Sequence, residues 1–196
     1  MSIFQKMIID MNEWCRGRNG WIRIPFIIFF VWVFVKHMQN PEYKSIIGAL
    51  NLGIHELGHF IFAPFGEMLN VLGGTITQLA APVLAMVNFI RQRDYFAIAL
   101  CFGWLSTNFF EVATYAGDAK EQMLPLVGPG TEYPMHDWNF ILKKFNMVNQ
   151  CGDVANVFRF CAIIAMTACM FMGIYIIVKM LTTKRDPDEP MDFSRV

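Results

Sequence analysis

The apolar residues of the chain fall into five runs separated by polar segments. The runs cover about residues 22–35, 46–65, 68–90, 95–115 and 160–180. A helix needs about 20 apolar residues to cross a bilayer, because each residue adds about 1.5 Å to its length. The first run is shorter, but Arg23 and Lys36 can snorkel from its ends and Trp21 can anchor it at the interface. The pattern predicts an all-α, polytopic membrane bundle of about five transmembrane helices.

Three polar segments lie outside these runs: an arm to about residue 20, residues 119–157 and the tail 182–196. The composition of the tail favours disorder. In the middle segment, apolar residues from Trp138 onward share one helical face, which predicts an amphipathic interfacial helix over 138–148 with Asp137 as its N-cap. The segment exceeds what two neighbouring spans need, so we expect either a lid at a site or an anchor on the bilayer surface. Residues 1–181 are expected to form one membrane-embedded domain.

The composition agrees with an integral, multi-pass membrane protein whose main partner is the lipid bilayer. Of 196 residues, 55% are hydrophobic and 16% are charged, against about 25% charged residues in soluble domains. The net charge is zero and no Lys/Arg cluster alternates with exposed aromatic residues, so nothing in the sequence supports nucleic acid as a partner. In a five-span bundle, lysine and arginine divide evenly between the two sides, so charge does not orient the chain.

The second run contains the sequence His-Glu-Leu-Gly-His at residues 55–59. On a helix, His55 and His59 point from one face and can bind one zinc ion, while Glu56 can act as general base. Without a metal, burying these ionisable groups in lipid would cost several kcal/mol. Asn51 extends the polar stripe by one turn, and it can bond either a histidine ligand or another helix.

A hydrolytic zinc site needs a third protein ligand and leaves the fourth position to water. The fourth run offers a polar face, because its helical positions within an arc of about 80° include Asn108, Glu111, Tyr115 and Asp118. Asp118 is the first candidate for the third ligand. His136 is the second, since a neutral imidazole binds zinc equally well, and Glu111 is the third. In the run after the motif, Gln78 can contact either substrate or another helix, because Pro82 frees its carbonyl group.

The motif helix and the run that follows it, with Gly73-Gly74, Pro82 and Asn88, resemble the site-2 protease family of intramembrane zinc metalloproteases, and within it small bacterial members. The resemblance covers about residues 44–120. In that family an aspartate from an Asn...Leu-Asp-Gly motif reaches the metal from a later helix. Here the nearest counterpart is Asn108 followed by Ala116-Gly117-Asp118, which lacks the prolines of the motif and its residue order.

The resemblance implies a zinc-dependent metalloprotease of a bacterial inner membrane, with one Zn²⁺ per chain. It would hydrolyse peptide bonds in or next to transmembrane segments of a membrane-protein substrate, with Glu56 activating a zinc-bound water. Two other functions remain open on the same residues. One is a membrane zinc hydrolase that acts on a lipid or another non-protein substrate, and the other is a non-catalytic, zinc-binding membrane protein.

Overall fold

The computed structural model describes residues 2–125 and 135–183, and over these ranges the chain is helical, without strands. Three single-turn 3₁₀ helices adjoin longer ones: η1 (Trp21–Arg23), η2 (Ala63–Phe65) and η3 (Val148–Gln150). The predicted all-α class is confirmed, and the tail from residue 184 lies outside the described residues. The α-helices are α1 (Ile3–Cys15), α2 (Ile24–Gln39), α3 (Gly48–Phe62), α4 (Glu67–Gln92), α5 (Tyr95–Gly117), α6 (Asp137–Lys144) and α7 (Cys151–Thr182).

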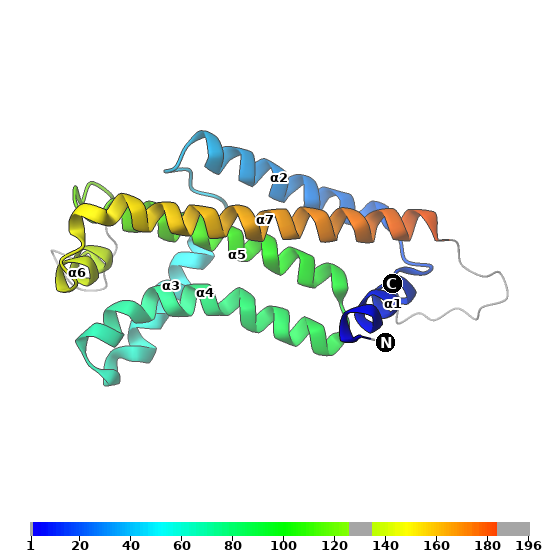
Figure 1. The fold of residues 1–196 in the computed structure, drawn as a ribbon, viewed down its shortest axis with the longest axis horizontal. Coiled ribbons are helices and arrows are strands. Elements are labelled where there is room, and N and C mark those ends of the chain that lie inside the picture. The colour runs from blue at the N-terminus through cyan, green and yellow to red at the C-terminus, as the bar shows by residue number, and fades with distance from the viewer. Residues whose placement is uncertain (1, 126–134, 184–196) are drawn as a thin grey trace.

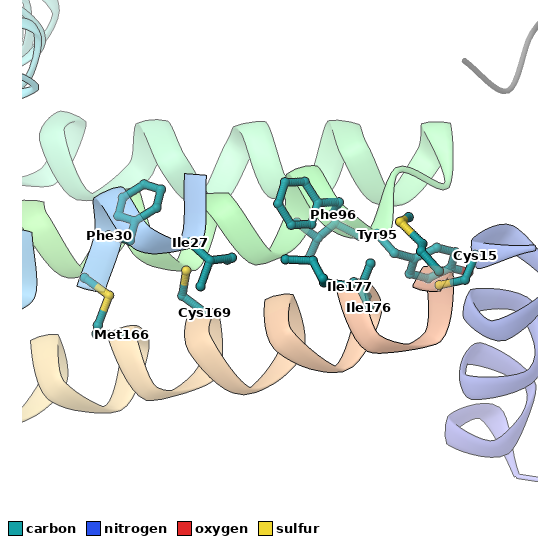
Figure 2. Packing of buried hydrophobic residues seen from close by; sticks show 11 residues of the cluster. Cys15, Ile27, Phe30, Tyr95, Phe96, Met166, Cys169, Ile176 and Ile177 are labelled. Atoms are coloured by element: carbon teal, nitrogen blue, oxygen red, sulfur yellow. The ribbon is translucent and has the colours of Figure 1, made fainter. Parts of the chain in front are cut away.

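The centre of the bundle is the antiparallel pair α5 and α7, with α2 packed against both (Figure 1). Two glycines let α2 approach closely, as small residues do between membrane helices. A Cβ on Gly173 would lie 2.3 Å from Ile27 Cδ1, and one on Gly103 would lie 2.6 Å from Phe30 Cδ1. Figure 2 shows these two α2 side chains inside the apolar core, with Met166 of α7 nearby.

Four helices are long and apolar enough to cross a membrane, which indicates a membrane protein: Trp21–Gln39, Glu67–Gln92, Tyr95–Gly117 and Val148–Thr182. The expected span over 46–65 is not among them. Its helix α3 has 15 residues, which at 1.5 Å each gives about 22 Å against the roughly 30 Å of a bilayer core. The apolar run is longer than its helix because Pro64 falls in η2 and Gly66 turns the chain at φ 93°, a conformation that favours glycine.

Contacts between helices define two ends of the molecule. Just before α2, Gly20 lies against Ile177 near the end of α7. At the other end of α2, His37 stacks on Phe110 of α5. Next to it, the carbonyl group of Pro41 accepts a hydrogen bond from the Thr114 hydroxyl group. The chain therefore leaves α2 at the end that carries α6, which we call the α6 end. α3 lies in that half of the molecule, and α1 lies at the opposite end, the α1 end (Figure 1). The amino-terminal arm, expected as a polar segment, forms α1.

The helix α6 differs from its prediction at both ends. Its N-cap is His136, whose Nδ1 accepts a hydrogen bond from the Asn139 N–H at 3.2 Å, and it ends at Lys144. The assignment of Asp137 as N-cap was therefore wrong, because Asp137 is the first residue of the helix. Buried apolar side chains of α6, Trp138 among them, pack against α4, α5 and α7. Protein, rather than the bilayer surface, covers this face.

Gly58 allows α3 and α4 to touch, and its replacement tests that contact. A Cβ on Gly58 would lie 2.2 Å from the carbonyl oxygen of Gly73, a backbone atom that cannot rotate away. We expect Gly58→Ala to lower the free energy of unfolding in detergent by about 1–3 kcal/mol, as overpacking does. Gly53→Ala is the matched control, because a Cβ there meets nothing within 4 Å. Equal thermal stability of the two variants would contradict the close contact.

Candidate metal centre

Three side chains that can bind a metal meet beside α3: His55, His59 and Asp137. The histidines share one face of α3, and Asp137 reaches them from the first turn of α6. Asp137 Oδ2 lies 2.9 Å from His55 Nε2 and 3.2 Å from His59 Nε2, and all three ligand atoms lie within 4.8 Å of one another. Atoms that each bind one tetrahedral zinc ion at about 2 Å are about 3–3.5 Å apart. The spacing therefore suits a single ion.

The second nitrogen of each imidazole is held by an acceptor. His55 Nδ1 lies 3.0 Å from Gln78 Oε1, and His59 Nδ1 lies 2.8 Å from the carbonyl oxygen of Asn70. The orientation of the Gln78 amide is fixed because its Nε2 donates to Glu111. Each Nδ1 therefore carries a proton, and in a neutral ring Nε2 keeps its lone pair. Two lone pairs then face a carboxylate oxygen, an arrangement that repels unless a cation or protons lie between them. The site fits a bound metal ion.

Asp137 is positioned by the end of α5 as well as by the histidines. Its backbone N–H donates to the hydroxyl group of Tyr115 at 3.0 Å. Burial raises the pKa of the Asp137 carboxyl, whereas hydrogen bonds and positive charge from protonated His55 and His59 rings lower it, and with that positive charge present the pKa lies below its usual range. Asp137 is therefore an ionised ligand candidate, and Tyr115, expected near the site from the sequence, holds its backbone.

Behind His55, a polar network connects α3 and α4 to α5. Glu111 Oε2 accepts hydrogen bonds from Gln78 Nε2 at 3.2 Å and from Asn51 Nδ2 at 2.9 Å. Asn51 Oδ1 in turn accepts from Trp104 Nε1–H at 2.7 Å. Of the residues expected around the ligands, Gln78 touches His55 directly, whereas Asn51 bonds another helix. Such partners fix the orientation and tautomer of a histidine ligand.

Replacing Gln78 tests this support. We expect Gln78→Leu to weaken zinc binding about 10- to 100-fold, because His55 loses the acceptor that keeps its Nε2 aimed at the ion. Gln92→Leu makes the same change at the exposed end of the same helix and should leave affinity unchanged. Competition with a chromophoric chelator measures both dissociation constants. Equal affinities in the two variants would remove Gln78 from the support of His55.

Glu56 lies on the same helix as the two histidines and lines a cavity of about 950 Å³. The three ligand candidates line the same cavity, with walls from α3, α4 and α5. Its rim includes residues 41–45 together with Leu124, Pro125 and Met135 from the long connection between α5 and α7. One cavity therefore holds a candidate metal site, a candidate general base and room for a substrate. Residues 126–134 of the expected lid or anchor segment lie outside the described residues.

Asp118 and His136, the two residues favoured as third ligand, contact each other instead of the motif histidines. The Asp118 carboxylate accepts backbone N–H bonds from Met123 at 2.9 Å and Leu124 at 3.0 Å, and it thereby closes the turn after α5. Its Oδ2 lies 3.3 Å from His136 Nε2. Their assignment as ligands is corrected, because the described group that can hold a metal contains Asp137 in their place.

The remaining candidates lie farther from the ligands. Glu111 reaches His55 only through Gln78, and Asn108 donates to the carbonyl of Trp104 one turn earlier in its own helix. The sequence signal for Asp137 was its position beside His136, but a carboxylate at the start of a helix is also typical of a cap.

Comparisons with protein-family models, curated proteins and solved structures find no match to this chain. Its function is therefore inferred from its own residues and their geometry.

Proposed function

We propose that the chain is an intramembrane zinc metalloprotease that crosses a bacterial inner membrane several times. The observation that carries the proposal is the convergence of the His55 and His59 Nε2 atoms on the Asp137 carboxylate, with each Nδ1 held by an acceptor. Two features support it further. Four helices are long and apolar enough to cross a membrane, and two of them, α4 and α5, line the cavity at the ligands together with α3.

The residues of the cavity can divide the chemistry of peptide hydrolysis between them. Zinc bound by the two histidines and Asp137 would supply a Lewis acid that lowers the pKa of a water towards 7. Glu56 accepts a proton from the water that attacks the peptide carbonyl, and then passes it to the leaving amine. Within the described ranges the Glu56 carboxylate makes no hydrogen bond, so both of its oxygens are available for this transfer.

A helical peptide substrate would have to unwind before it is cleaved, because its amides are hydrogen-bonded within the helix and shielded by side chains. An unwound segment would reach the ligands past the rim of the cavity. The rim is formed by residues 41–45, Leu124, Pro125 and Met135. Hydrolysis of a transmembrane peptide and of a lipid ester, measured in parallel on the same protein, distinguishes a protease from a lipid hydrolase. The peptide is expected to be cleaved. Turnover of the lipid ester alone would overturn the proposed substrate class.

Zinc content tests the site itself. The purified protein is expected to hold about one zinc per chain, and His55→Ala or His59→Ala should remove it, because two ligands cannot retain the ion against buffer. His37→Ala is the matched control, since His37 in α2 is as buried as His55 but lies outside the ligand group. Elemental analysis after gel filtration gives the stoichiometry. Unchanged zinc in the His55 and His59 variants would refute the site.

A further inference from the structure

The described lysines and arginines number seven at the α1 end of the bundle and six at the α6 end, and the larger difference lies across α2, with four before it and two between its last turn and α4. With five spans, the lysines and arginines were expected to divide evenly between the two sides of the membrane. Because α3 is not one of the spans, the turn between α4 and α5 falls at the α1 end and the count changes. Lys184 and Arg185 follow α7 directly in the sequence. Among the described residues the α1 end carries Lys6, Arg16, Arg18, Arg23, Arg91, Arg93 and Lys179. The α6 end carries Lys36, Lys44, Lys120, Lys143, Lys144 and Arg159.

Three of the cations at the α1 end come from different elements and gather around aromatic rings. The Cζ atoms of Arg18 and Arg23 lie 4.3 and 5.7 Å from the centre of the Trp14 ring. Burial raises the pKa of the neighbouring Cys15 thiol to about 11. The positive charges of Arg18, Arg23 and Lys179 each lower this pKa, so all three cations lie near Cys15. Cations and aromatic rings at one depth are typical of the boundary between a bilayer and water.

The helix α1 fits that boundary. It lies across the end of the bundle rather than within it (Figure 1), and it is too short to cross a membrane. Met7 and Ile9 are 48% and 45% exposed, and Trp21 just beyond α1 is 69% exposed. Apolar and aromatic side chains next to a set of cations are the features with which a helix binds at the surface of an anionic leaflet.

We propose that the α1 end faces the cytoplasmic leaflet, where its cations set the orientation and meet anionic phospholipid headgroups, and that the His55 cavity opens on the opposite side of the membrane. Four lysines and arginines precede α2, against Lys36 in its last turn and Lys44 between α2 and α4, and the charge around the first span usually dominates the orientation. The cavity rim at residues 41–45, Leu124 and Met135 belongs to the α6 end. The inference rests on the multi-pass insertion proposed above but not on zinc or proteolysis.

Cysteine labelling in intact cells tests the orientation. Gln92→Cys places a thiol at the α1 end and Asn149→Cys places one at the α6 end, and both positions are exposed and uncharged. With a membrane-impermeant maleimide, Asn149→Cys is expected to label fully in intact cells and Gln92→Cys only after permeabilisation. The unmodified chain gives the background from its five native cysteines, four of which are buried. Labelling of Gln92→Cys in intact cells, alone or with Asn149→Cys, overturns the orientation. Retention in the membrane after alkaline extraction tests insertion separately.

Charge variants of the labelled chains test whether the cations set this orientation. Lys6→Gln combined with Arg16→Gln should expose part of the Gln92→Cys population to the reagent in intact cells, because two of the four cations that precede the first span are lost. Lys143→Gln combined with Lys144→Gln removes two cations from the other end and should leave Gln92→Cys protected. Equal protection in both charge variants would refute the role of the α1-end cations.

Discussion

Glu56→Gln is expected to retain zinc and to lose peptide hydrolysis. The amide has the shape of the carboxylate but cannot accept a proton from the attacking water. Glu56 lies outside the three-residue group that can hold the ion, so the metal should stay. Loss of a general base lowers turnover by about 10² to 10⁴, and the variant should fall by that factor while its zinc content matches that of the unmodified protein.

Zinc content and turnover have to be measured on the same preparation. Glu67→Gln provides the control, because Glu67 is exposed at the start of α4 and does not line the cavity of the ligands. It should keep both zinc and activity. Undiminished hydrolysis by the zinc-loaded Glu56→Gln protein would remove Glu56 from the mechanism, and loss of zinc from that variant would make Glu56 a ligand rather than a base.

Local spacing was enough to predict the long apolar helices and two of the three ligand candidates. The apolar runs at 68–90, 95–115 and 160–180 correspond to α4, α5 and the second part of α7, since helix periodicity and length are local properties. The same holds for His55 and His59, whose separation of four residues puts them on one face whatever the rest of the chain does. The error at 46–65 came from measuring hydrophobicity alone, although Pro64 and Gly66 already limited the helix.

The third ligand candidate could not be derived in this way, because its position depends on how distant segments pack. Asp118 has the expected helical phase with Glu111 and Tyr115, but it falls just after the last turn of α5, where backbone N–H groups take both of its oxygens. Asp137 reaches the histidines only because the buried face of α6 packs on α4, α5 and α7, and because Tyr115 holds its backbone. Neither contact has a fixed spacing from the motif.

Asp137→Ala is expected to weaken zinc binding by more than about 100-fold, beyond the 10- to 100-fold range typical of residues that only support a ligand. It removes the one carboxylate of the group and leaves two imidazole lone pairs facing each other. Asp118→Ala should change affinity little, because Asp118 bonds the turn after α5. His136→Ala should have an intermediate effect, since its Nδ1 caps the helix that presents Asp137.

Chelator competition gives the zinc dissociation constants of the three purified variants. The order of these three constants, rather than any one of them, separates the three roles. His136→Asn offers a side-chain acceptor at the same cap position. It should therefore restore most of the affinity lost in His136→Ala, which a replaced metal ligand would not permit. Affinity that survives in Asp137→Ala but disappears in Asp118→Ala would transfer the third ligand to the end of α5. That outcome would require α5 to extend by a turn and α6 to leave the two histidines.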